Sequence, residues 1–282
     1  MAEPDAPLRI WHQSFTVLDD VPHYDAALRR HLAAVARPGT SIDLHGMRPG
    51  TYPSDYPGTH IGFSYLSDLH KEQFVQGALD AEAAGYDAYM IATIPDIGFE
   101  EIRTLVDMPV VAFGHASVHA AAQLGSKVGI VNFIGALAPQ LRRNFEHYRV
   151  ADLVGPIVQV DARFADVMAA YAAPDQLVAA FEDAVRRAAE AGADVVVPGE
   201  GPLNVFLADQ GVTEVDGIPV VDSLGALVAQ AEDRVRAYRR TGVRPARTGF
   251  YGARPARELV EAARAFYGLP SSIGATSRER PA

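Results

Sequence analysis

The chain has 282 residues, of which 49% are hydrophobic and 21% charged, and its formal net charge is −10. This composition is typical of a globular protein with an ample core, and the acidic balance argues against nucleic acid or an anionic membrane as a partner. The chain has no cysteine, which excludes disulfides, thiolate metal sites and thiol nucleophiles. No signal peptide is visible at the start and no apolar run approaches the roughly 20 residues of a membrane span, so we expect a cytoplasmic protein.

Short apolar segments alternate with longer amphipathic segments along the chain. In chain order, the pattern predicts a strand at 8–11, a helix at 24–35, a strand at 41–44, a Gly-, Pro- and Tyr-rich loop at 47–65, a helix at 67–84, strands at 88–92 and 110–113, a helix at 117–124, a strand at 128–132, a helix at 136–147, a strand at 157–160, a helix at 175–191, strands at 195–197 and 219–222, and helices at 224–241 and 254–267. Such alternation is typical of βαβ units with parallel sheets. The polar segment 276–282 is predicted to be disordered.

Two pairs of segments resemble each other in the same order. The sequence AEAAGYDAYMIAT at 81–93 resembles AEAGADVVVPGE at 189–200, and in both the last residue lies eight positions after the glycine. The segment 106–124 resembles 215–231, because each is a turn, a Pro-led strand, a short loop and a helix. The repeat predicts two similar α/β halves. Thr93 and Glu200 then occupy equivalent places at the carboxyl ends of strands, which is where open parallel sheets bind ligands.

Glu200 and Thr93 differ in what they can do chemically. Glu200 lies between Gly199 and Gly201, which allow close approach of the backbone to a ligand, and its carboxyl group could act as a general base or acid. The alternative is a glutamate in a surface loop. The Thr93 hydroxyl could bind a substrate carboxylate or oxyanion, or act as a nucleophile beside a base. The alternative is a strand threonine bonded to nearby backbone.

Polar residues after the first strand form a further group of candidates. His12, Gln13 and Ser14 are expected on the ligand side of the sheet, although a loop with one helix cap is the alternative. Asp96 is expected to cap a helix that begins near Gly98.

Histidines and a long loop complete the candidate site. His115 and His119 are one helical turn apart, but a single such pair is a weak metal signal and no metal is expected. Ser117, near a predicted helix start, could help backbone N–H groups to hold an anion. Loops as long as 47–65 are often lids, so its aromatic and histidine side chains are expected over the substrate, the alternative being a surface excursion; these are Tyr52, Tyr56, His60 and Tyr65.

Three segments resemble the aspartate/glutamate/hydantoin racemase superfamily over roughly 8–240: AYMIATIPDIGF at 88–99, PVVAFGHASVH at 109–119 and DVVVPGEGP at 194–202. The resemblance implies two pseudo-symmetric Rossmann-like domains, each with αβα layers and a mostly parallel sheet, with a cleft between them. It also implies a small-molecule substrate, no cofactor or metal, and a possible homo-oligomer. We expect the first domain to comprise 1–112 and 222–282, and the second 113–221.

This chain departs from the superfamily at the positions that matter most. In the superfamily, two cysteines exchange a proton on opposite faces of the substrate carbon, and Thr93 and Glu200 stand at those positions here. His115 stands where hydantoin racemases usually have a glutamate. Because a hydroxyl is a far poorer base than a thiolate, two-thiol racemisation is excluded.

The unequal pair favours attack by water over two-sided proton exchange. We therefore expect a cofactor-independent enzyme that hydrolyses or ring-opens a small carboxylate, amide or hydantoin-like substrate, with Glu200 as acid/base, Thr93 at the oxyanion and His12 as a further catalytic residue. One alternative is a racemase or isomerase in which Glu200 and a histidine (His12, His60 or His115) are the two bases. The others are a decarboxylase, a metal-dependent hydrolase and a ligand-binding protein without catalysis.

Overall fold

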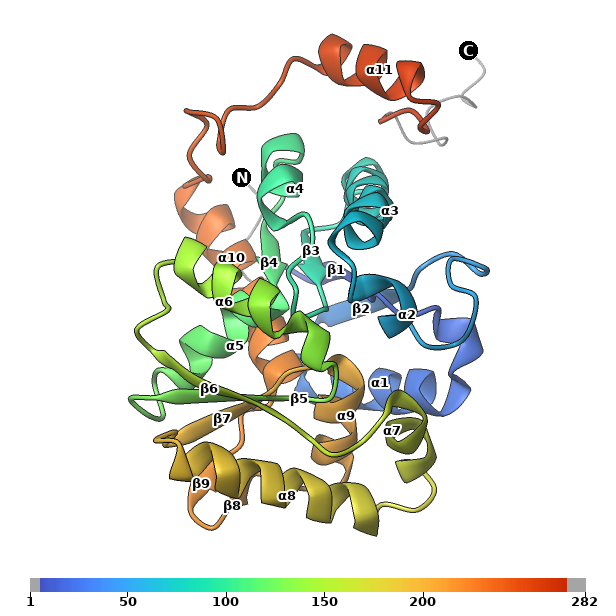
Figure 1. The fold of residues 1–282 in the computed structure, drawn as a ribbon. Coiled ribbons are helices and arrows are strands. Elements are labelled where there is room, and N and C mark those ends of the chain that lie inside the picture. Colours follow the sequence, from blue (N-terminus) through green and yellow to red (C-terminus); the bar gives the residue numbers. More distant parts are fainter. Residues whose placement is uncertain (1–5, 273–282) are drawn as a thin grey trace.

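The computed structural model describes residues 6–272, whose main strands form two parallel sheets (Figure 1). The first sheet has the strand order β2-β1-β3-β4, and the second has the order β6-β5-β7. The strands are β1 Leu8–Gln13, β2 Thr40–His45, β3 Ala88–Ile91, β4 Val110–Ala112, β5 Val128–Asn132, β6 Val154–Gln159 and β7 Val195–Pro198, with a short antiparallel pair β8 Glu214–Val215 and β9 Ile218–Pro219. The predicted α/β class with mostly parallel sheets is confirmed.

The two halves repeat one topology. A parallel bridge between Val196 and Val220 adds a fourth position beside β7, so the second sheet has the same strand connections as the first. A helix-start contact also recurs. Gly114 donates its backbone N–H to Asp96 Oδ1 at 2.7 Å, and Leu224, 110 positions later, donates to Asn204 Oδ1 at 3.0 Å. The pseudo-symmetric fold predicted from the sequence repeat is therefore confirmed.

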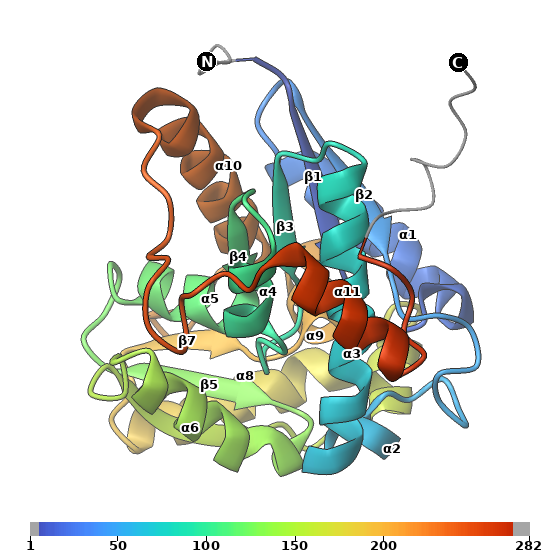
Figure 2. The same cartoon turned by 90° about the horizontal axis from the view of Figure 1, so that it is seen from above.

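Helices cover the sheets and connect the halves (Figures 1 and 2). Helix α3 packs on β1 and β3, α8 packs on β5 and β6, and α10, which follows the second sheet, returns to pack on β3 and β4. The α-helices are α1 Pro22–Val35, α2 Gly58–Ile61, α3 Ser64–Ala83, α4 Phe99–Leu105, α5 Phe113–Ala121, α6 Ala138–His147, α7 Phe164–Ala170, α8 Asp175–Glu190, α9 Gly201–Asp209, α10 Ser223–Thr241 and α11 Arg257–Phe266, and 3-10 turns lie at Leu18–Asp20 and Gly135–Leu137. The division into 1–112 plus 222–282 and 113–221 stays a prediction.

Two element boundaries differ from the sequence prediction in ways that affect the site. Strand β1 continues to Gln13 because its parallel pairing with β2 and β3 runs two residues past the predicted end. Helix α5 begins at Phe113 instead of 117, because the Asp96 carboxyl group accepts the otherwise unpaired N–H groups of Gly114 and His115. Asp96 therefore caps α5 and not the helix near Gly98, which corrects the expectation.

Other boundaries differ less. The predicted strand 219–222 is reduced to β9 and the bridge at Val220, and the predicted strand 157–160 begins earlier, as β6. Between residues 6 and 272, none of the helices combines the length and apolarity that crossing a bilayer requires. The segment 276–282, predicted to be disordered, lies outside the described residues.

Candidate active site

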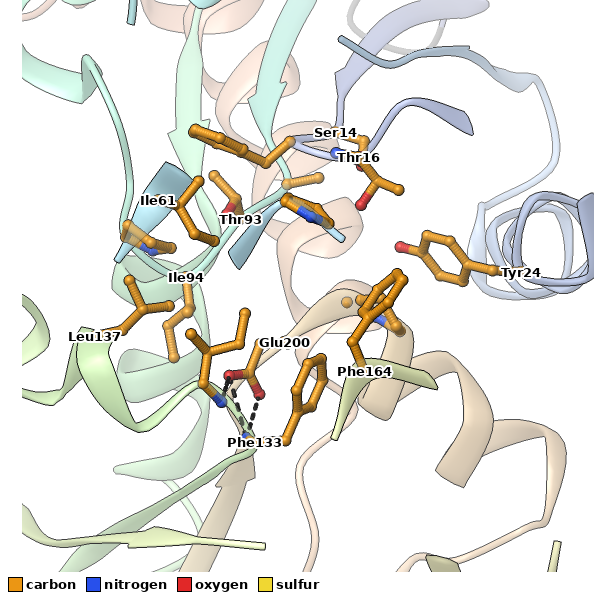
Figure 3. Close-up of a pocket in the computed structure, with 17 residues that line it drawn as sticks. Ser14, Thr16, Tyr24, Ile61, Thr93, Ile94, Phe133, Leu137, Phe164 and Glu200 are labelled. Atoms are coloured by element: carbon orange, nitrogen blue, oxygen red, sulfur yellow. Dashed lines mark hydrogen bonds between the residues drawn. The ribbon is translucent and has the colours of Figure 1, made fainter. Parts of the chain in front are cut away.

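A small cavity of about 40 Å³ lies where the carboxyl ends of the two sheets meet (Figure 3). Its walls come from the residues that follow β1, β3, β5 and β7, which is the edge where parallel sheets bind ligands. Helix α1, the loop before α2 and the start of α7 close the remaining sides. The lining residues are Ser14, Phe15, Thr16, Tyr24, Pro57, Ile61, Ala92, Thr93, Ile94, Pro95, Phe133, Ile134, Leu137, Phe164, Glu200, Gly201 and Pro202.

Glu200 is the residue immediately before α9, and its carboxyl group is held by backbone. The N–H of Ile134 donates to Oε1 at 3.0 Å, and the N–H of Phe133 lies 3.2 Å from both oxygens. Burial raises the pKa of Glu200 to about 8, and these two N–H donors act in the opposite direction by favouring the ionised form. A carboxyl group with a pKa this close to neutrality can both take and return a proton at physiological pH.

Thr93 lies across the cavity from Glu200 (Figure 3). It follows β3, and its backbone carbonyl accepts from the N–H of Asp96 at 3.0 Å in a tight turn whose last residue has a φ of 51°. That turn is anchored to the start of α5 by the Asp96 carboxyl group. Thr93 is 8% exposed, and its hydroxyl has no hydrogen-bond partner among residues 6–272. This hydroxyl is therefore available to a ligand.

Two further hydroxyl groups line the cavity and were not found from the sequence. Thr16 follows β1 by three residues, and Tyr24 projects from α1 with its phenol oxygen toward the cavity (Figure 3). Helix α1 reaches the cavity by packing on α9 of the other half. This contact depends on tertiary structure, and no local pattern in the sequence signals it.

The cavity is otherwise apolar, with side chains such as Ile61, Leu137 and Phe164 in its walls. Glu200 is the only lining residue with an acidic or basic side chain, apart from the phenol of Tyr24. A substrate carboxylate would therefore find no lysine, arginine or histidine among the lining residues.

Of the three candidates after β1, only Ser14 lines the cavity. Because β1 extends to Gln13, the side chains of His12 and Gln13 alternate between the two faces of the sheet. His12 is 1% exposed, both its ring nitrogens lack partners within residues 6–272, and burial lowers its pKa to about 4. Gln13 donates to the carbonyls of Ser14 and Gly46 and accepts from the Trp11 ring. Neither is placed to meet a substrate.

The segment 47–65, predicted to be a lid, contributes different residues to the cavity wall from those expected, and its role as a lid stays a prediction. Pro57 and Ile61 line the cavity, whereas the Tyr52 hydroxyl donates to the carbonyl of Phe15 at 2.7 Å and His60 Nδ1 lies 2.9 Å from His70 Nε2. Tyr52 and His60 thus make contacts within the protein and do not face the cavity. Two other tyrosines of this segment also lie outside the lining: Tyr65 is 73% exposed, and Tyr56 stacks on Phe164 at 5.1 Å.

The candidates on α5 lie away from the cavity. Because α5 begins at Phe113, Ser117 falls within the helix and donates to the carbonyl of Phe113 at 2.7 Å, so it is not at a helix start. His115 packs against His119 and Tyr148, and burial lowers its pKa to about 4. No group of three or more possible metal-binding side chains was found in the described part of the chain, and the absence of a metal stays a prediction.

The two glycines beside Glu200 have different surroundings. At Gly199, a Cβ atom would lie 2.9 Å from the Cβ of Asn132, so glycine permits β7 to pass close to β5 there. Gly201 lines the cavity, and a Cβ at that position would lie 2.8 Å from the Tyr24 hydroxyl oxygen.

Comparison with known proteins decides the family. The family model described as Asp/Glu/Hydantoin racemase matches residues 24–231. The chain belongs to the Asp/Glu/hydantoin racemase family. A hydantoin racemase of Paenarthrobacter aurescens is 30% identical over 221 residues, which cover 76% of this chain and 88% of that protein.

Solved structures in the same fold support this assignment at the level of architecture. An allantoin racemase from Klebsiella pneumoniae has a TM-score of 0.70 and 22% identity, covering 88% of this chain and 94% of its own. The Pseudomonas fluorescens allantoin racemase has a TM-score of 0.69 and 21% identity, covering 88% and 97%.

Membership of the racemase family changes the order of the functional alternatives. The comparisons do not support the expected hydrolase, and they favour the racemase or isomerase alternative. Since the chain contains no cysteine, this protein cannot use thiols to move a proton.

Proposed function

We propose that the protein is a cofactor-independent isomerase that moves a proton at the carbon beside a carbonyl group of a small cyclic amide, with Glu200 as its acid/base. The observation that carries the proposal is the environment of Glu200: a buried carboxyl group with a pKa of about 8, held by two backbone N–H groups, in a cavity that faces the unpartnered Thr93 hydroxyl. Racemisation of a hydantoin-like ring is the reaction that suits this site best.

The lining of the cavity supports a neutral substrate. An amino acid carries a carboxylate that needs a cationic or multiply hydrogen-bonded partner when buried. No lining residue is cationic, and the two backbone N–H groups of Phe133 and Ile134 are already bonded to Glu200. A 5-substituted hydantoin has no carboxylate on its ring, and the apolar walls would accept its substituent. The curated relative is named a hydantoin racemase, which agrees with this class.

The reaction can be written with Glu200 alone. The ionised carboxylate takes the proton from the ring carbon, and the C–H electron pair moves toward the adjacent carbonyl, which becomes an enolate. The Glu200 carboxylic acid then returns a proton to the same carbon. Because the enolate carbon is planar, return to the opposite face inverts the centre once the ring has turned over, which requires the walls of this small cavity to move apart. The Thr93 hydroxyl holds a polar atom of the ring during these steps.

A racemase with two bases would need a histidine that faces Glu200 across the cavity. His12, His60 and His115 do not line the cavity. The proposal is therefore a one-base isomerase, and it keeps Glu200 and Thr93 from the sequence prediction with Ser14 and Gly201 as neighbours of the substrate.

Hydrogen exchange at the ring carbon tests the proposal. A panel of 5-substituted hydantoins is incubated with the protein in D₂O, and loss of the C–H signal is followed by NMR together with optical rotation. We expect exchange and racemisation by the wild type, and a loss of about 10³-fold or more in Glu200→Gln, since general-base catalysis contributes about 10²–10⁴.

A matched control is Glu232→Gln. Glu232 is 1% exposed and accepts from the Thr40 hydroxyl at 2.6 Å, outside the cavity. The folded fraction of this variant should keep the wild-type rate. Ring opening without prior exchange, detected as a carbamoyl amino acid, would instead support the hydrolase alternative. Full activity in Glu200→Gln would remove Glu200 from the chemistry.

A further inference from the structure

Tyr24 is a buried residue whose hydroxyl faces the cavity and is not used by the reaction as proposed. Tyr24 is 2% exposed, and its phenol has no hydrogen-bond partner in the region 6–272. Figure 3 shows the oxygen pointing into the cavity from the side of α1. Because the oxygen lies at the cavity wall, it stays accessible from the cavity, and its O–H is free to donate to a ligand or a water there.

The backbone beside Glu200 leaves room for this hydroxyl. Gly201 is the first residue of α9, and a Cβ there would lie 2.8 Å from the Tyr24 oxygen but 3.9 Å from the ring carbon that bears it. Any side chain at 201 would therefore displace the hydroxyl and leave most of the ring in place. The Tyr24 oxygen thus meets the cavity beside the acid/base residue, at the amino end of a helix, where negative charge is favoured.

The phenol is suited to donate a hydrogen bond, and it is not suited to act as a base that takes a proton from carbon. Burial raises the pKa of Tyr24 above its ordinary value, so the hydroxyl keeps its proton throughout the range in which Glu200 titrates. The neighbouring Tyr171 ring, 6.4 Å away, holds the Tyr24 ring from the side, while the Tyr171 hydroxyl donates to the carbonyl of Pro202 at 2.9 Å. The two tyrosines therefore differ in that only Tyr171 has its hydroxyl bonded within the described structure.

We propose that Tyr24 is a catalytic residue whose O–H donates a hydrogen bond to the substrate carbonyl oxygen as that oxygen becomes an enolate, and that Gly201 is glycine so that this hydroxyl can reach it. The role rests on the proposed function. When Glu200 takes the proton from the ring carbon, the electron pair ends on the carbonyl oxygen, and the phenol stabilises that charge without losing its own proton. A donor aimed at developing charge strengthens in the transition state, so it acts on kcat more than on KM.

A double-variant cycle tests this role. Tyr24→Phe should lower kcat for hydrogen exchange by about 10²–10³, the effect of removing one oxyanion donor, and should change KM by less than about threefold. Gly201→Ala should cause a similar loss, because it displaces the same hydroxyl. In the Tyr24→Phe background, Gly201→Ala should lower kcat by less than about threefold further, because the atom it displaces is gone.

Two measurements distinguish a failure of this inference from a failure of the proposed function. Tyr171→Phe removes a neighbouring hydroxyl and should leave kcat within about threefold of the wild type, and Tyr24→Phe should keep the apparent pKa near 8 that belongs to Glu200. If the wild type exchanges and Glu200→Gln does not, a kcat within threefold of wild type in Tyr24→Phe overturns the role of Tyr24 alone. Equal losses from Gly201→Ala with and without the hydroxyl also overturn it. A wild type that exchanges no hydantoin overturns the proposed function and this role together.

Discussion

The backbone N–H of Ile134 donates to the Glu200 carboxyl oxygen Oε1 at 3.0 Å, which ties the residue before α9 to the end of β5. This bond and its neighbour from Phe133 favour an ionised carboxylate, whereas burial of the group favours the neutral acid. The balance gives a pKa of about 8. A group that is held in place while its two protonation states are nearly balanced is a suitable proton carrier at neutral pH.

The stability of the protein should reflect the buried acid. The folded-state pKa of Glu200, about 8, lies above its ordinary value of 4.5, so its favourable contribution is present below pH 4.5 and is lost as the pH rises through about 8. Glu200→Gln stays neutral and keeps an acceptor for both N–H groups. At pH 9 we expect this variant to exceed the wild type by roughly 1–3 kcal/mol in the free energy of unfolding, with a smaller difference near pH 4. Urea unfolding at the two pH values measures this, and a less stable variant at pH 9 would contradict it.

Activity should rise with pH where stability falls. The base form of Glu200 is needed in the free enzyme, so log kcat/KM for exchange should climb with a slope near one and level off above about pH 8. The measurement is the rate of exchange at limiting substrate from pH 5.5 to 9.5. A profile that is flat or falls across pH 8 would show that another group carries the proton.

The N–H groups of Phe133 and Ile134 should accept a substitute carboxylate when the side chain is cut back. In Glu200→Ala, they lose the acceptor that they have in the wild type. Added formate or acetate should bind there as a positioned general base. It should raise the exchange rate of Glu200→Ala at least about tenfold above its rate without added carboxylate. Chloride at the same ionic strength serves as the control. Rescue equal to that by chloride would argue against a site that positions a base.

The sequence was sufficient to place Thr93 and Glu200 because both follow buried strands, and the rule that ligands bind at the carboxyl edge of parallel sheets depends only on strand order. It could not place His12, because β1 ends two residues later than predicted and His12 therefore lies within the strand. Ser117 was misplaced for a similar reason, since a cap from Asp96, 21 positions earlier, moved the helix start. The position of Tyr24 in the cavity could not be predicted, because it depends on the contact between α1 and α9, which belong to different halves.

The isotope content of the two enantiomers tests the central claim most directly, which is that Glu200 alone carries the proton. A single enantiomer of a 5-substituted hydantoin is treated in D₂O to low conversion, the enantiomers are separated, and deuterium at the ring carbon is measured in each. One base serves both faces, so the account predicts similar deuterium content in the recovered starting enantiomer and in the product. Deuterium confined to the product enantiomer, with the recovered starting material unlabelled, would require two bases and would contradict the account.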